Sequence, residues 1–161
     1  MPKTVYKNSS MKKLTSLQFL EIFSPRVDLI QKKIIQFFSE LKICGDTEIW
    51  LNSMKSELTS DQIIEQYGSL TFYEWTCNEL YFDKKEINHC FKKALQLIIK
   101  QIENFLKESF PSNKFCIIAS VQYGKLANIN VRIHLYRENE LYLEPELKDF
   151  KQPILYEFFE S

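Results

Sequence analysis

The last third of the chain alternates hydrophobic and polar positions with a period of two, which is typical of strands covered on one face. Between residues 115 and 135 the alternating hydrophobic side chains carry odd numbers: Phe115, Ile117, Ala119, Val121, Tyr123, Ile129, Val131, Ile133 and Leu135. Because directly paired residues point to the same face, the loop joining the two strands must have an odd number of residues. A loop at 124–126 meets this condition and places Val121 opposite Ile129. Further strands are predicted at 140–144 and 154–160.

Upstream of these strands, a hydrophobic repeat of helical period predicts two long amphipathic helices, Pro25–Ile43 and Asp83–Phe110. Proline suits the first turn of the first helix. Asp83 and Glu86 have the spacing of a capping box, and Pro111 prevents the second helix from continuing. A helix with one hydrophobic face must cover a hydrophobic partner. The predicted fold class is therefore α+β, a C-terminal antiparallel β-meander covered on one face by two long amphipathic helices.

Between the two long helices the chain shows one short helix and one extended segment. The helix is predicted at 61–67, capped by Thr59 or Ser60 and closed by Gly68. Residues 70–82 are rich in strand-forming side chains and are expected to be extended.

Composition narrows the domain organisation and the possible functions. Residues 1–14 are polar and lysine-rich, which indicates a flexible basic tail, and residues 15–161 are expected to form a single α+β domain. Three glycines cannot build a phosphate-binding glycine loop. Basic and acidic residues balance at 21 each, which argues against direct nucleic-acid binding through general electrostatic attraction.

The four cysteines and the N-terminal sequence indicate the compartment. The cysteines lie in hydrophobic surroundings without C-x-x-C spacing, which is typical of buried free thiols. The first ten residues are polar, and no hydrophobic run approaches the ~18 residues of a membrane span. We expect a reduced, cytoplasmic protein with no membrane partner.

A metal or Cys–His site would have to be assembled from His89, Cys90, Cys116 and His134. Their spacing matches no known ligand pattern, and adjacent helical residues diverge by about 100°. We therefore expect a surface histidine and buried thiols, with no metal, no cofactor and no catalytic residues.

The polar face of the second strand carries Asn130, Arg132, His134 and Tyr136. An imidazole, a guanidinium and an aromatic ring on one surface could hold a ligand or a protein. An ordinary solvated sheet face has the same composition, and both interpretations stay open.

The segment from Arg132 to Leu155, which contains RIHLYRENELYLEP and FKQPIL, resembles small bacterial immunity proteins of polymorphic toxin systems. In that family a strand with His and Arg leads to a Gly-Glu-x-Trp-Leu-like turn, an acidic stretch and a closing Pro-Ile/Val-Leu strand. Here Asn139 and Tyr142 stand in place of that glycine and tryptophan. The resemblance implies a non-enzymatic inhibitor that blocks one cognate toxin in the cytoplasm of the producing cell.

The expected partner surface is the turn after the second strand and the acidic segment that follows it. Its candidate residues are Tyr136, Arg137, Glu138, Glu140, Tyr142 and Glu144. Their carboxylates would complement the basic cleft of a toxin that attacks nucleic acid. Arg132 and His134 form an alternative ligand face, which would suit a small enzyme or ligand-binding domain. Exposed aromatic residues around Trp50 and Tyr73–Trp75 are a further candidate interface, and a phage-encoded inhibitor of host defence is a third reading of the function.

Overall fold

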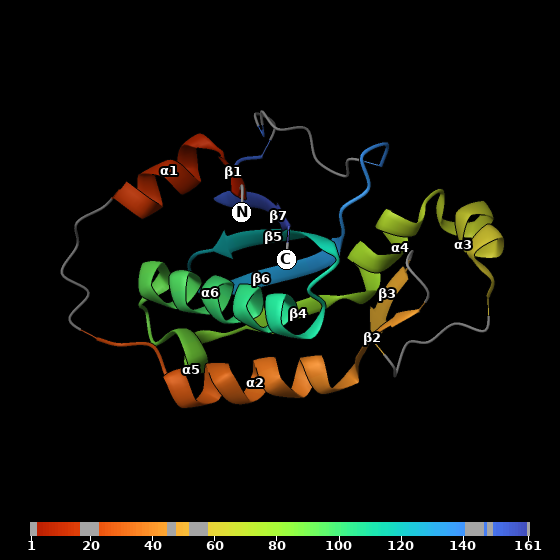
Figure 1. Ribbon diagram of the computed structural model, residues 1–161. Helices are drawn as coiled ribbons and strands as arrows, with labels where there is room; N and C mark the ends of the chain where they lie inside the picture. Colours follow the sequence, from red (N-terminus) through yellow and green to blue (C-terminus); the bar gives the residue numbers. More distant parts are fainter. Residues whose placement is uncertain are drawn as a thin grey trace.

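A five-stranded antiparallel sheet forms the centre of the molecule, with the strand order β1-β7-β5-β6-β4 (Figure 1). The computed structural model describes residues 3–16, 23–44, 48–51, 58–140, 147 and 150–160, without the side chains of 42–44, 48–51 and 158–160. The five strands are β1 Lys3–Lys7, β4 Glu79–Phe82, β5 Lys114–Gln122, β6 Asn128–Leu135 and β7 Ile154–Glu160. A separate two-stranded sheet pairs β2 Leu41–Cys44 with β3 Glu48–Leu51.

The register between β5 and β6 confirms the prediction made from parity. Val121 pairs with Ile129, and Gln122 with Asn128. The loop therefore spans residues 123–127 and is longer than expected, but its length is still odd. Gly124 occupies the left-handed region in this loop, with φ at 94°.

The expected meander order is wrong. A meander would place the last strand beyond β6, whereas β7 pairs with β5 on its other edge, and β4 pairs with β6. The reason is that β5 carries hydrophobic residues on both faces and so takes the central position, with a neighbour on each side. The strand predicted at 140–144 lies outside the described residues except for Glu140.

The two long predicted helices are shorter in the structure than their hydrophobic stripes, and six helices are described. They are α1 Ser9–Ser16, α2 Val27–Glu40, α3 Ser60–Tyr67, α4 Leu70–Cys77, α5 Lys84–Ile87 and α6 Phe91–Ser109. Thr59 forms a capping box at the start of α3, and Gly68 closes that helix in the left-handed conformation, as predicted.

The predicted helix Asp83–Phe110 is interrupted between α5 and α6. Asn88 and His89 both have positive φ, at 50° and 62°. Asparagine tolerates this conformation, and its Nδ2 donates to the carbonyl of Ser24 at 2.9 Å. The thiol of Cys90 also bonds the carbonyl of Phe23, at 2.8 Å. Contacts with the segment before α2 therefore stabilise the interruption between α5 and α6. The hydrophobic repeat continues across this interruption, so the sequence pattern did not predict it.

Residues 70–82, which were expected to be extended, form α4 followed by β4. The Ser69 hydroxyl accepts a hydrogen bond from the backbone N–H of Phe72 at 3.0 Å, which caps α4. Tertiary packing of the buried residues of α4 outweighs the strand propensity of its aromatic side chains.

The N-terminal segment is not a flexible tail. Strand β1 pairs with β7 at the edge of the sheet, and α1 follows directly. Asn8 caps α1, because its Oδ1 accepts from the backbone N–H of Met11 at 2.8 Å. Pairing with a distant strand holds β1 in place, and no local pattern reveals such a partner.

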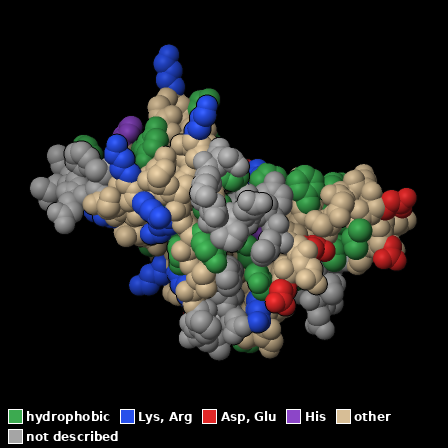
Figure 2. All heavy atoms as spheres, turned by 90° about the horizontal axis from the view of Figure 1, so that it is seen from above, with side chains coloured by type: hydrophobic (Ala, Val, Ile, Leu, Met, Phe, Trp, Pro, Cys, Tyr) green, Lys and Arg blue, Asp and Glu red, His purple; other side chains and the backbone are tan. Residues whose placement is uncertain are grey.

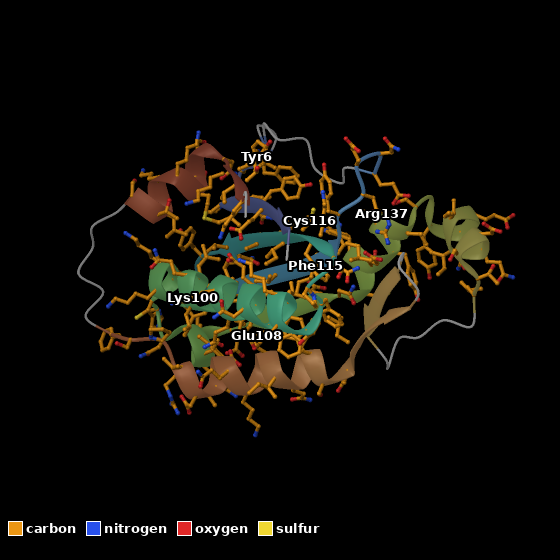
Figure 3. The ribbon with its side chains drawn as sticks, in the orientation of Figure 1. Tyr6, Lys100, Glu108, Phe115, Cys116 and Arg137 are labelled. Carbon is orange, nitrogen blue, oxygen red and sulfur yellow. The ribbon has the colours of Figure 1, made fainter. Side chains whose placement is uncertain are left out.

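One buried cluster joins the odd-numbered residues of β5 and β6 to α2 and α6. Helix α6 lies along the sheet, and α2 packs against α6 and β4 (Figure 1). The second face of the sheet has its own buried cluster, made by Cys116, Ile118, Leu147, Ile154 and Tyr156. Figure 3 shows Cys116 and Phe115 on the two sides of β5, with Phe115 toward α6. We call the side of Cys116 and Ile118 the outer face.

Candidate functional site

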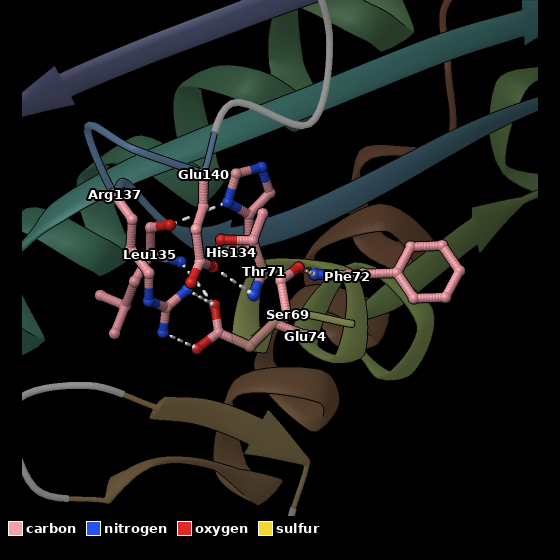
Figure 4. Close-up of polar contacts among 8 residues, drawn as sticks. All are labelled: Ser69, Thr71, Phe72, Glu74, His134, Leu135, Arg137 and Glu140. Carbon is pink, nitrogen blue, oxygen red and sulfur yellow. Dashed lines mark hydrogen bonds and ion pairs between the residues drawn. The ribbon is translucent and has the colours of Figure 1, made fainter. Parts of the chain in front are cut away.

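A buried ion pair joins α4 to the end of β6 (Figure 4). Glu74 is fully buried, and its Oε1 accepts from Arg137 Nη2 at 2.6 Å. Its Oε2 accepts from Arg137 Nη1 at 3.1 Å and from the backbone N–H of Leu135 at 2.8 Å. Both carboxylate oxygens are therefore satisfied, in the two-pronged geometry that favours arginine. The pair fixes α4 on the sheet.

The predicted partner residues divide into internal and external ones. Arg137 forms the ion pair with Glu74, and it also donates to Thr71 Oγ1 at 3.1 Å. Glu140 accepts from the backbone N–H of Thr71 at 3.1 Å, in the first turn of α4. Glu138 is exposed and Tyr136 is half-buried. Tyr142 and Glu144 lie outside the described residues.

His134 is not part of a solvated ligand face. Its side chain is buried, and burial lowers its pKa to about 4. The ring is therefore neutral near pH 7, and Nδ1 donates to the carbonyl of Leu135 at 2.8 Å. The alternation of the strand placed His134 on the correct face, but it could not reveal that this end of the face is covered.

A cleft of about 670 Å³ lies on the outer face. Its floor comes from four strands, through even-numbered residues of β5, β6 and β7 and through Tyr81 of β4. Its walls are Trp75 of α4 and the segment before β7. The residues that line it are Trp75, Tyr81, Ile118, Ser120, Gln122, Asn128, Asn130, Arg132, Phe150, Gln152 and Ile154. Hydroxyl and amide groups thus form most of the polar lining, and three aromatic rings border it.

Arg132 is held at the wall of this cleft. Its guanidinium lies 3.4 Å from the centre of the Trp75 ring, and Phe72 stacks on the same tryptophan with centroids 5.9 Å apart. Arg132 Nη2 bonds Glu79 Oε1 at 3.1 Å, and the amide of Asn130 also donates to Glu79. Arg132 is therefore fixed and its charge is balanced before any ligand enters.

The wall opposite α4 depends on Asn8. Its Nδ2 donates to the carbonyls of Phe150 at 3.0 Å and Gln152 at 2.7 Å. Its Oδ1 accepts from the backbone N–H of Ile154 at 3.1 Å. Asn8 is 5 % exposed, so these bonds are shielded from water. The segment that was expected to be a flexible tail therefore positions one side of the cleft.

A second cavity, of about 420 Å³, borders the cleft. Gln122 and Gln152 line both spaces. The second cavity also contains two exposed lysines, Lys13 of α1 and Lys151. Figure 2 shows Lys and Arg side chains gathered toward the side where α1 lies, and acidic side chains toward the α3 end.

A second buried carboxylate lies on β7, beneath α6. Glu157 is 2 % exposed and its Oε1 lies 2.8 Å from Lys3 Nζ. Lys3 also bonds Glu103 of α6 at 2.5 Å. Burial, and then a hydrogen bond with Glu103, raise the pKa of Glu157 to about 8. Burial alone would raise the pKa of Glu103 as well, but hydrogen bonds with Glu157 and Lys3 lower it.

Among the described residues, no group of three or more potential ligands lies close enough together to hold a metal ion. The cysteines at 77, 90 and 116 are buried free thiols. Burial raises the pKa of Cys116 to about 12, so that thiol is protonated and a poor nucleophile at neutral pH. His89, by contrast, is exposed.

Sequence reasoning missed Asn8, Gln152 and the lysines at 13 and 151 as site residues. Each sits in a segment that looked like a tail or a connector. Lys151 and Gln152 belong to the FKQPIL stretch of the family resemblance, but no binding role was assigned to them. Trp75 was named only as a possible interface aromatic. Tyr73 beside it is buried, and the side chain of Trp50 lies outside the described residues. The usable signal was the even-numbered polar set on β5 and β6, which does line the cleft.

Residues 6–160 match the family described as the uncharacterized protein PM0498 family, and the chain belongs to that family. Searches of curated proteins and of solved structures each found no match. Within the described ranges, no helix is long and hydrophobic enough to span a bilayer.

Proposed function

We propose that this protein acts by binding another protein and not by catalysis. In this proposal it is an immunity protein that occludes the active site of a cognate toxin in the cytoplasm. The observation that carries the proposal is the aromatic rim of the outer-face cleft, made by Trp75, Tyr81 and Phe150, with Phe72 stacked on Trp75. Aromatic residues and arginine concentrate at the centres of protein interfaces. Phe72 and Phe150 are each 38 % exposed and Tyr81 is 47 % exposed.

The turn after β6 extends this surface. Helix α4, which carries Phe72 and Trp75, is bonded to Arg137 and Glu140. The exposed Glu138 therefore lies in the turn that is anchored to the same helix. The acidic side chains toward the α3 end (Figure 2) support a partner with a basic surface, which such charges would steer into contact.

The test is co-expression with a toxin encoded in a neighbouring reading frame. The wild-type protein should restore growth, and Trp75→Ala or Tyr81→Ser should remove the protection. Phe23→Ala is the matched control, because Phe23 is 61 % exposed and does not line the cleft. Retained melting temperatures distinguish lost binding from lost folding. The absence of both a neighbouring toxin and any protection would refute the proposal.

A second candidate is a ligand-binding domain that uses the same cleft. Its volume of about 670 Å³ is within the roughly 300–1,000 Å³ of small-molecule sites. Arg132, predicted for this alternative, lines it together with Asn130 of the same strand face, whereas His134, the other predicted residue, does not. Binding of a small molecule by the purified protein, with no partner present, tests this candidate separately.

A further inference from the structure

We propose that the outer-face cleft and the adjoining lysine-lined cavity form one nucleotide site, in which the cleft holds the base and the lysines hold the phosphate. This inference names the ligand class of the second candidate and rests on that candidate. It does not require the protein to be an immunity protein.

The cleft has the chemistry of a base-binding compartment. Aromatic rings at Tyr81 and Phe150 border it, and base–aromatic stacking tolerates any base. Amide side chains at its floor can pair with the donors and acceptors on a base edge. Arg132 is already balanced by Glu79, so the ring compartment carries no net charge among its described residues. An uncharged planar ring fits this lining better than a charged group.

The adjoining cavity offers two ammonium groups to a phosphate, beside a lining that is otherwise largely hydrophobic. Lys13 and Lys151 are both exposed there, on α1 and on the segment before β7. No acidic side chain is among the described residues that line this cavity. An ammonium group binds phosphate through a charge-assisted hydrogen bond, about twice as strong as a neutral one.

The two compartments share lining residues, and the proposed ligand spans them at that point. Gln122 and Gln152 line each space. Asn8 fixes the backbone of Gln152, and Ser10 Oγ donates to the carbonyl of Lys151 at 3.2 Å. The backbone N–H of Val121 also bonds the carbonyl of Pro153 at 3.0 Å. The segment that carries Phe150, Lys151 and Gln152 is therefore anchored before a ligand arrives, which lowers the entropy cost of binding.

The balanced net charge of the chain does not oppose this site. Balance removes the long-range attraction that drives general nucleic-acid binding. A local pair of lysines acts over a few ångströms and needs no excess of positive charge elsewhere. The site therefore suits a single nucleotide unit, either free or at a position in a single strand.

The experiment is calorimetric titration of the full-length protein with AMP, GMP, CMP and UMP, and with the four matching nucleosides. We expect the preferred nucleotide to bind at least about tenfold more tightly than its nucleoside, a difference of about 1.4 kcal/mol. A double substitution, Lys13→Gln with Lys151→Gln, should abolish that difference and leave nucleoside affinity unchanged. Lys12→Gln, at the exposed neighbour on α1, is the matched control and should leave the difference intact.

Trp75→Ala should weaken nucleoside and nucleotide alike, by about tenfold or more, because it removes a wall of the cleft and the ring that holds Arg132 in place. Tyr81→Ser provides a second variant at a more exposed position, in case Trp75→Ala fails to fold. A short single-stranded oligonucleotide distinguishes the two sources of the ligand. Tighter binding of the oligonucleotide than of every mononucleotide assigns the site to single-stranded nucleic acid, whereas equal or weaker binding assigns it to free nucleotides.

Several results would overturn the inference. One is the absence of binding by all four mononucleotides and the oligonucleotide at millimolar concentration. Another is equal affinity for inorganic phosphate and for the nucleotides, which would eliminate the base compartment. A loss of discrimination in Lys12→Gln as large as in the double variant would eliminate the phosphate compartment. An acidic peptide that binds through the two lysines while nucleotides do not would assign the groove to a protein. The toxin co-expression test is unaffected by any of these outcomes.

Discussion

Two buried glutamates, Glu74 and Glu157, have their charges compensated by different means. Glu74 on α4 receives both prongs of the Arg137 guanidinium and one backbone N–H. Glu157 on β7 shares the ammonium of Lys3 with a second carboxylate, Glu103. One cation faces one carboxylate at the first position. At the second, Lys3 faces both carboxylates, and Lys107 contacts only Glu103, at 3.7 Å.

The difference shows what a buried carboxylate requires. A fixed guanidinium matches both oxygens of Glu74 and leaves none of its charge uncompensated. At the second position burial, and then the hydrogen bond with Glu103, raise the pKa of Glu157 to about 8, so the pair retains one proton at neutral pH. Charge compensation in the arginine pair therefore depends on geometry, whereas the protonation of the lysine cluster depends on pH.

The largest effect is expected for Glu74→Ala. It leaves the guanidinium of Arg137 and the N–H of Leu135 without their acceptor in a buried setting. Removal of one partner from a buried pair costs about 3–5 kcal/mol. Urea denaturation measures this loss, and Glu74→Gln, which keeps an acceptor, should lose less. A loss below about 1 kcal/mol for the alanine variant would mean that the pair does not hold α4 on the sheet.

Removal of each cation in turn should cost much stability at the Glu74 position and little at the Glu157 position. Arg137→Ala leaves Glu74 with a charge that water cannot reach, since the Glu74 side chain is 1 % exposed. Its cost should approach that of Glu74→Ala. Lys3→Ala should cost about 1 kcal/mol or less, because Lys3 is 39 % exposed and Glu157 already holds a proton at neutral pH. Equal losses at pH 7 would contradict the comparison.

Glu157→Gln should change how stability depends on pH. An acid whose folded-state pKa exceeds its unfolded value binds its proton more tightly when folded. Its stabilising contribution is complete below the unfolded value of 4.5 and is lost as the pH rises toward about 8. The melting temperature of the wild-type protein should therefore fall between pH 5 and pH 9, a range that includes the titration of Glu157. The melting temperature of the glutamine variant should fall less over the same range. Glu138→Gln is the exposed control, and a slope unchanged in Glu157→Gln would disprove the shared proton.

The smallest effect is expected for Glu138→Lys. Glu138 is exposed and lies next to the buried pair without belonging to it. Its substitution should change the free energy of unfolding by no more than about 0.5 kcal/mol. In the toxin assay it should slow association with a basic partner, an effect that added salt reduces. A large stability loss would show that the turn is held by more than Arg137 and Glu140.

The sequence by itself determined the features that depend on neighbouring residues. Alternation along β5 and β6 specified which side each residue faces, and parity specified the pairing of Val121 with Ile129. Capping chemistry located the start of α3 and of α5. These features follow from contacts within a few positions, so the α+β class and the even-numbered floor of the cleft were predictable.

Only the tertiary structure decided the features that depend on distant partners. A period of two says which side of a strand is hydrophobic but not which element covers it, so the burial of His134 was hidden. Strand order depends on which pairings bury the most surface, so β7 joined β5 and the presumed tail joined β7. The cleft walls come from Asn8, Trp75 and Phe150, which are far apart in the chain. Local patterns cannot specify such contacts, because their free energy appears only when the sheet has formed.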